Sequence, residues 1–355
     1  TTTGANGTVA VGYQALTALT TGVRNVAVGY MAGTANTIGY GNTFLGYESG
    51  RYETEGYENT FIGQKSGRES VTDASYHNAY IGSNAGEYLD SGFRNVSVGR
   101  SAMRGTDESG NNAAYNVAVG NHALTAITDG DYNVALGAYA GDAITTGTNN
   151  VAIGYNALTA GNSGESHHVA IGSSALAAMD GASDGNVAIG SSAGASITTG
   201  SGNIAIGYQG LLENTTGVRN IAIGYGAMDG TQAGGTQSTS ADSDDNIFIG
   251  YDAGGGAWVN NKSEHNIAIG NYAMDEALNA ANSNIAIGNA TLGALVEGDF
   301  NIAIGRLAGT AMTNGLNNII IGYGAMETAN SGENNNIAIG HQALNVMDDS
   351  GADDN

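Results

Sequence analysis

One short motif occurs nineteen times along the chain, and this repetition constrains the fold more than any other feature. Its core reads Asn-(Val/Ile)-Ala-(Val/Ile)-Gly, and ten of the eighteen spacings between successive terminal glycines are 17 residues while four are 18. Such a period predicts a solenoid, in which each repeat forms one coil that stacks on the next. The terminal glycines are Gly12, Gly29, Gly46, Gly63, Gly82, Gly99, Gly120, Gly137, Gly154, Gly172, Gly190, Gly207, Gly224, Gly250, Gly270, Gly288, Gly305, Gly322 and Gly340.

Two positions before each glycine are aliphatic. The residue directly before it is Val, Ile or Leu in all nineteen copies, and the residue three before it is Val or Ile in sixteen. We call these two the flanking positions, and the residue between them the middle position. Because neighbours in a strand point to opposite faces, both flanking positions share one face of a short strand. We expect that face to line the inside of the coil as a hydrophobic column.

The middle position then points outward. It is Ala in thirteen copies and carries no charge in any copy. We expect this outward face to pack closely against another chain, with a bare solvent face as the alternative. Its representative residues are Ala152, Ala205, Ala222 and Ala303.

The remaining columns of the repeat indicate turns and ladders. Asn precedes the strand in 17 of the nineteen copies, and stacked asparagines can hydrogen-bond from coil to coil. The glycine allows a sharp turn, after which we expect a second short strand. The residues assigned to this framework are Asn150, Val151, Ile153, Gly154, Asn203, Ile204, Ile206, Gly207, Asn301, Ile302, Ile304 and Gly305.

The predicted fold is therefore all-β: a parallel β-solenoid of about 19 coils of roughly 17 residues each. We expect one continuous body over residues 1–355, with its longest insertion at 226–246. The sequence Asp353-Asp354-Asn355 stands where the next motif would begin, so we interpret the chain as a fragment of a longer fibre.

Composition excludes several functions. The 33 acidic and 10 basic residues give a net charge of −23, which disfavours nucleic acid and anionic membrane surfaces as partners. Cysteine is absent, so the chain has no disulfide and no thiolate chemistry. No apolar run approaches the length of a membrane span. Proline is also absent, as expected where almost every backbone N–H is needed for ladder hydrogen bonds.

Candidate binding residues lie near the longest insertion. Trp258, the only tryptophan, could stack on a glycan, or it could pack on its own coil. An acidic cluster in the insertion could bind Ca²⁺ loosely through carboxylate oxygens, or it could be a solvated acidic loop. It consists of Asp242, Asp244 and Asp245. We predict no other cofactor and no metal site, because the six histidines are scattered over different repeats.

We do not expect an enzyme. A tail-spike glycosidase would need paired carboxylates, whereas the acids here fall mostly in turns and variable positions. An ice-binding or mineral-binding solenoid would need a flat array of regularly spaced threonines, and the Thr-Thr-Gly turns are too irregular for one.

The segment from Asn150 to Gly161, Asn-Val-Ala-Ile-Gly-Tyr-Asn-Ala-Leu-Thr-Ala-Gly, resembles the head repeats of YadA-type trimeric autotransporter adhesins. It is also similar to repeats of phage tail fibres and bacterial trimeric fibre proteins. The resemblance implies a left-handed β-roll, a homotrimer, and an extracellular place on a virion or a bacterial cell. It further implies that the segment projects from that surface or attaches to another one, with a surface glycan or protein as receptor. A self-assembling extracellular filament without a receptor is the alternative.

Overall fold

The computed structural model describes residues 6–70, 75–106, 110–160, 164–180, 183–230, 242–258, 261–329 and 332–346. The chain divides into two compact units. Unit 1 comprises Thr1–Ser173 with Asp180–Ala182, and unit 2 comprises Ser174–Met179 with Ser183–Asn355. Both are parallel β-solenoids with one three-residue strand per coil, so the predicted fold class is confirmed, with about 17 residues in a turn. That a single continuous body covers residues 1–355 stays a prediction.

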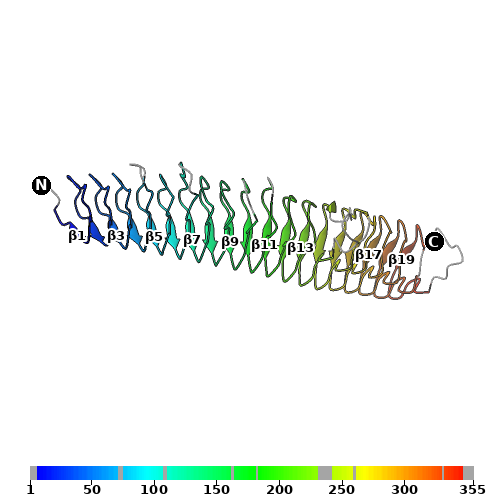
Figure 1. Ribbon diagram of the computed structural model, residues 1–355. Coiled ribbons are helices and arrows are strands. Elements are labelled where there is room, and N and C mark those ends of the chain that lie inside the picture. Colours follow the sequence, from blue (N-terminus) through cyan, green and yellow to red (C-terminus); the bar gives the residue numbers. More distant parts are fainter. Residues whose placement is uncertain are drawn as a thin grey trace. The chain divides into compact units, whose positions relative to one another are not determined.

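Unit 1 carries strands β1 to β10. They pair in chain order, parallel and in register, so that residues of the same motif position lie above one another (Figure 1). The strands are β1 (Val9–Val11), β2 (Val26–Val28), β3 (Thr43–Leu45), β4 (Thr60–Ile62), β5 (Ala79–Ile81), β6 (Val96–Val98), β7 (Val117–Val119), β8 (Val134–Leu136), β9 (Val151–Ile153) and β10 (Val169–Ile171).

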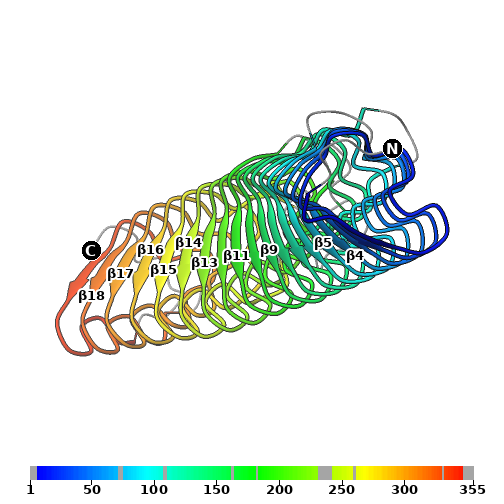
Figure 2. The same cartoon turned by 90° about the vertical axis from the view of Figure 1, so that its left-hand side faces the viewer.

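Unit 2 carries strands β11 to β19 with the same parallel, in-register pairing. Within each unit the strands lie side by side along one wall of the coil, and turns complete each coil (Figure 2). The strands are β11 (Val187–Ile189), β12 (Ile204–Ile206), β13 (Ile221–Ile223), β14 (Ile247–Ile249), β15 (Ile267–Ile269), β16 (Ile285–Ile287), β17 (Ile302–Ile304), β18 (Ile319–Ile321) and β19 (Ile337–Ile339).

The turns recur at fixed positions of the repeat. In the coil of β9, Asn149, Asn156 and Leu158 all adopt left-handed backbone angles, with φ of 59°, 53° and 53°. Gly154 has a φ of 135°, and a Cβ built on it would lie 2.5 Å from the carbonyl oxygen of Gly172 in the next coil. Only glycine fits there, because the position combines an unusual φ with close backbone approach. This explains why the motif ends in glycine in every copy.

The second short strand predicted after the glycine does not form in the described residues. That segment is a series of turns, although its backbone still bonds to the next coil, as from Leu124 N to the Ala140 oxygen at 3.0 Å. The left-handed residues in the turns break the extended conformation that a strand requires. Coil-to-coil bonding therefore continues beyond the one true strand.

The asparagine ladder is confirmed. In unit 2 the amide N–H of Asn203 donates to Oδ1 of Asn186 at 2.9 Å, and the N–H of Asn220 donates to Oδ1 of Asn203 at 2.9 Å. The Nδ2 of Asn203 also donates to the carbonyl oxygen of Gly217 at 2.8 Å. Each ladder asparagine thus satisfies backbone groups of the next coil from inside the solenoid, where all of these side chains are buried.

Candidate self-association face

The inward and outward faces of the strands are the reverse of those expected from the sequence. In every strand from β2 to β19 the middle residue is buried, and both flanking residues are half-exposed or exposed. The expectation that the flanking aliphatics line the coil interior is therefore wrong. Val151, Ile153, Ile204, Ile206, Ile302 and Ile304 belong to the framework as strand residues, but their side chains face outward.

The predicted alanine association face is wrong for the same reason. Ala152 and Ala205 are 1% exposed, and Ala222 and Ala303 are fully buried. These alanines pack inside the coil, whose interior is too narrow for a larger side chain at this position unless a neighbour shrinks. They cannot contact a second chain.

The interior shows that exchange of volume directly. Where the middle residue is aromatic, as in Phe44 and Phe61, the fourth residue after the motif glycine is itself a glycine. A Cβ added to Gly50 would lie 2.4 Å from the ring of Phe44, and one added to Gly67 would lie 2.4 Å from the ring of Phe61. Where the middle residue is alanine, that fourth position is usually Leu or Met. The two positions share one space in the core.

The outward flanking residues form a continuous surface along each unit, which we call the aliphatic face. It comprises both flanking residues of every strand, and because the strands are in register the side chains form two columns spaced about 4.8 Å per coil. None of its residues is charged. Its most exposed members in unit 1 are Val9, Val11, Val26, Leu45, Ile81, Val96, Val117, Val134 and Leu136, and in unit 2 Ile189, Ile269, Ile287, Ile304, Ile337 and Ile339.

Stacked tyrosines extend this apolar surface at the position directly after the motif glycine. In unit 1 the rings of Tyr13, Tyr30 and Tyr47 stack at centroid distances of 5.1 and 5.3 Å. In unit 2 Tyr208, Tyr225 and Tyr251 stack at 5.1 and 5.2 Å. All six are at least 41% exposed. Their ring faces are occupied by one another, which leaves ring edges and hydroxyls for outside contacts.

Of the two roles that the sequence allows for Trp258, the structure shows packing on its own coil. Its side chain is fully buried, its Nε1 donates to the carbonyl oxygen of Gly254 at 3.0 Å, and its ring meets Phe248 edge-on at 5.5 Å. A buried ring has no free face for a sugar, so stacking on a glycan is excluded in this structure.

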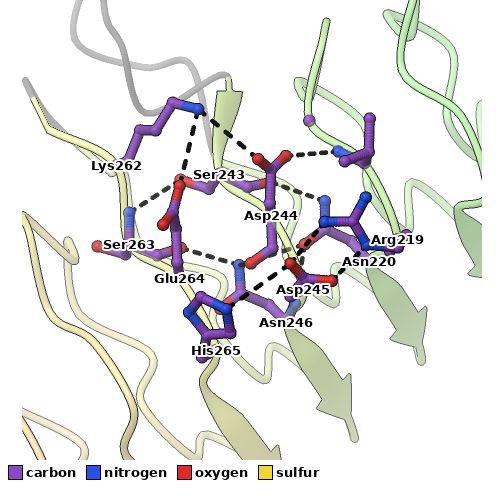
Figure 3. Close-up of polar contacts among 12 residues, drawn as sticks. Arg219, Asn220, Ser243, Asp244, Asp245, Asn246, Lys262, Ser263, Glu264 and His265 are labelled. Atoms are coloured by element: carbon purple, nitrogen blue, oxygen red, sulfur yellow. Dashed lines mark hydrogen bonds and ion pairs between the residues drawn. The ribbon is translucent and has the colours of Figure 1, made fainter.

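The aspartates near the insertion take part in an ion-pair cluster across three coils (Figure 3). Asp245 accepts two hydrogen bonds from Arg219, Nε to Oδ1 at 2.6 Å and Nη2 to Oδ2 at 2.7 Å, and these bonds lower the pKa of the carboxyl group. Nε2 of His265 lies 3.7 Å from Oδ2 of Asp245. Asp244 accepts from the N–H of Val218 at 2.7 Å.

This cluster does not assemble a Ca²⁺ site from the predicted aspartates. Lys262 Nζ lies 3.6 Å from Oδ2 of Asp244 and 3.7 Å from Oε1 of Glu264, so the carboxylates face cations of the chain itself. Asp242 lies half-buried at the end of the insertion, and residues 231–241 of the insertion lie outside the described residues. Within the described ranges no three His, Asp or Glu side chains are placed to hold a metal ion.

Glu53 is a buried acid that the sequence pattern did not single out. It is fully buried in unit 1, and its Oε1 accepts from the N–H of Gly56 at 2.6 Å. Burial raises the pKa of the carboxyl group to about 8. In other coils the same position, seven residues after the motif glycine, holds an apolar side chain such as Leu89 or Ile127, or an uncharged polar one such as Asn36. Glu53 is unusual there because it is ionisable.

Comparisons with models of protein families, with curated proteins and with solved structures found no match. The class that the fold itself defines is a parallel β-solenoid repeat protein. In the part of the chain that the structure describes, no helix has the length and apolar character to cross a bilayer.

Proposed function

We propose that the chain is a structural, adhesive segment of an extracellular fibre on a virion or cell surface, and that its copies associate along the aliphatic face. The observation that carries this proposal is the uncharged, mainly aliphatic surface along each unit of a chain that is otherwise strongly acidic. Soluble monomers rarely expose apolar patches beyond a few hundred Å², and larger ones mark interaction sites.

Charge points to a second copy of the chain as the partner. The net charge of −23 makes two copies repel each other at most surfaces. The aliphatic face carries no charge in any of the nineteen strands, so copies can meet there without placing carboxylates against carboxylates. The coil period of a second copy also matches this face along its length.

The size of the face is sufficient for stable association. Unit 2 alone presents eighteen aliphatic side chains from its nine strands. A standard interface buries ~800 Å² on each partner from about 20–30 residues a side, and these eighteen side chains approach that number. The stacked tyrosines beside it add further area.

The resemblance to trimeric adhesin and tail-fibre repeats supports three copies, a left-handed winding, and attachment to a surface glycan or protein as the task. The described side chains form ladders, ion pairs and core contacts. We accordingly propose a structural role and no catalysis.

Two substitutions in the same coil test the association. Ile304→Glu places a charge on the aliphatic face, where Ile304 is 37% exposed, while the control Asn314→Glu adds the same charge in an exposed turn. Sedimentation equilibrium of Ile304→Glu should show at least a tenfold weaker association than that of the native chain, because a carboxylate would be desolvated in the interface. Asn314→Glu should associate like the native chain. Equal weakening by both variants, or by neither, would count against this face as the interface.

A further inference from the structure

The residue that leads into each strand has the same unusual backbone conformation in every coil. We call it the entry position: it lies five residues before the motif glycine, and its φ lies between 55° and 74° in all nineteen copies. Left-handed angles suit glycine, asparagine and aspartate, and they are unfavourable for bulky side chains. A large apolar side chain at the entry position therefore does not help the backbone of its own coil.

Phe300 is the one purely apolar side chain among the nineteen entry positions. Its φ is 58°, and it is 61% exposed. Thirteen tyrosine and phenylalanine side chains are exposed in the described residues, and Phe300 is the only one of them that contacts no other ring. Packing within the chain thus gives no reason for a phenylalanine at this position.

Phe300 lies on the same side of the chain as the aliphatic face. Along the coil of β17 burial alternates with each residue: Phe300 is exposed, Asn301 is buried, Ile302 is half-exposed, Ala303 is buried and Ile304 is exposed. Alternation of this kind places every second side chain on one side of an extended segment. The ring therefore continues the aliphatic face outward by one residue.

The entry positions of unit 2 also change in charge along the unit. Those of β13 to β15 are ionisable and belong to the ion-pair cluster of Figure 3, whereas those of β16 to β19 are uncharged. From β13 to β19 they are Arg219, Asp245, His265, Ser283, Phe300, Asn317 and Asn335. Depletion of charge around an exposed aromatic side chain is typical of the core of a protein–protein interface.

We propose that Phe300 is the aromatic anchor of the association between copies of the chain, and that the core of the interface in unit 2 lies over β16 to β19. This inference rests on the proposed function. A single exposed ring would need no explanation by itself. Phe300, however, extends an uncharged aliphatic surface, and the net charge of −23 directs a second copy to such a surface.

Two substitutions at the entry position test the anchor. Phe300→Asn introduces the residue that the next two coils already carry there, in Asn317 and Asn335. The matched control is His265→Asn, because the His265 side chain is also 61% exposed but stands in the ionisable stretch. Each variant thus removes one exposed ring from the same backbone position and leaves a residue that suits the left-handed conformation.

Fluorescence-detected sedimentation from nanomolar to micromolar concentrations measures the concentration at which half of the assembly dissociates. For Phe300→Asn this midpoint should rise at least about tenfold, as expected for the loss of an aromatic anchor. For His265→Asn it should equal that of the native chain. An equal rise in both variants, or a rise in neither, would overturn the inference.

A second measurement separates an anchor from a residue that stabilises its own coil. Phe300→Asn is added to Ile304→Glu, and urea unfolding is followed at a concentration where Ile304→Glu is a single chain. Because asparagine suits the left-handed conformation, the urea midpoint should not fall. A lower midpoint would show that Phe300 stabilises the coil itself, and the inference would be wrong.

The same samples distinguish failure of the inference from failure of the proposed function. If Ile304→Glu weakens the association and Phe300→Asn does not, the aliphatic face is the interface but Phe300 is not its anchor. If the native chain sediments as a single molecule at every concentration, the association and its anchor are refuted together.

Discussion

At the scale of single residues, the interior of this solenoid is governed by volume exchange between two positions of each repeat. The middle residue and the fourth residue after the glycine share one space, so every aromatic middle residue accompanies glycine, while alanine accompanies leucine or methionine in nine of thirteen copies and glycine in the other four. Interiors of proteins are packed about as densely as organic crystals, so an aromatic ring leaves no room for a second large side chain there. The coil of β18 holds both Ile320 and Met326, and there the glycine that makes room is Gly309 of the preceding coil.

A double-mutant cycle at Phe61 and Gly67 tests this exchange. Phe61→Ala should cost about 3–5 kcal/mol of stability through the cavity it leaves. Gly67→Leu should also destabilise strongly, because its Cβ would lie 2.4 Å from the Phe61 ring. The double variant recreates the common alanine–leucine pair, so chemical denaturation should give a loss well below the sum of the two single losses. Additive losses would contradict a shared space.

Glu53 predicts a pH dependence of stability. Its pKa rises from 4.5 in the unfolded chain to about 8 in the folded coil, so the folded state binds the proton more tightly. The contribution of Glu53 to stability is therefore greatest below pH 4.5, is lost as the pH rises through 8, and changes by at most about 5 kcal/mol.

Thermal unfolding of Glu53→Gln, compared with the native chain between pH 4.5 and 9, measures this contribution. The variant should lack the part of the stability loss that Glu53 causes. The stability difference between the two proteins should therefore grow from pH 4.5 to about pH 8 and level off above it. A difference independent of pH would show that the carboxyl group does not titrate in this range.

At the scale of the strand, sequence reasoning predicted the period, the parallel ladder and the asparagine column, because each follows from regular spacing. The same reasoning was wrong about which face of the strand points into the coil. Alternation shows that Val151 and Ile153 share a face and that Ala152 lies on the other, but not which face is buried. Side-chain size suggested that the aliphatics are inside, whereas the interior mostly holds alanine at this position, beside a large turn residue.

A signal for the correct side was present in the sequence. The pairing of Phe44 with Gly50, and of Tyr80 with Gly86, shows that the middle position competes for space with a turn residue, which only an inward side chain does. The burial of Trp258 could not be predicted in the same way, because it depends on contacts that its irregular, glycine-rich turn makes with Phe248. The ion pairs of Asp244 and Asp245 depend likewise on register across three coils.

The asparagine ladder predicts a measurable cost for losing one member. Asn203→Ala removes the acceptor for the N–H of Asn220 and the donor to Gly217, and it leaves both backbone groups buried without partners. We expect a loss of about 2–4 kcal/mol, from two unsatisfied groups at 1–3 kcal/mol each with partial relaxation. Urea denaturation of Asn203→Ala measures it. A loss near zero would mean that the ladder aligns the coils without stabilising them.

At the scale of the whole molecule, the outward aliphatic face is the feature of the fold on which the proposed function rests. Each coil is held by backbone ladders, buried alanines and asparagines, and it leaves its branched aliphatic side chains for outside contacts. Within each unit, the stacking of repeats joins these short apolar strands into an extended surface. We propose that further copies of the chain cover this surface.

The solution mass of the native chain tests this account most directly. Sedimentation equilibrium at micromolar concentration and physiological salt should give a multiple of the 35.6 kDa chain mass, with three chains expected from the family resemblance. A species that stays at 35.6 kDa across the concentration range would contradict the account, because the aliphatic face would then be exposed to water in the native protein.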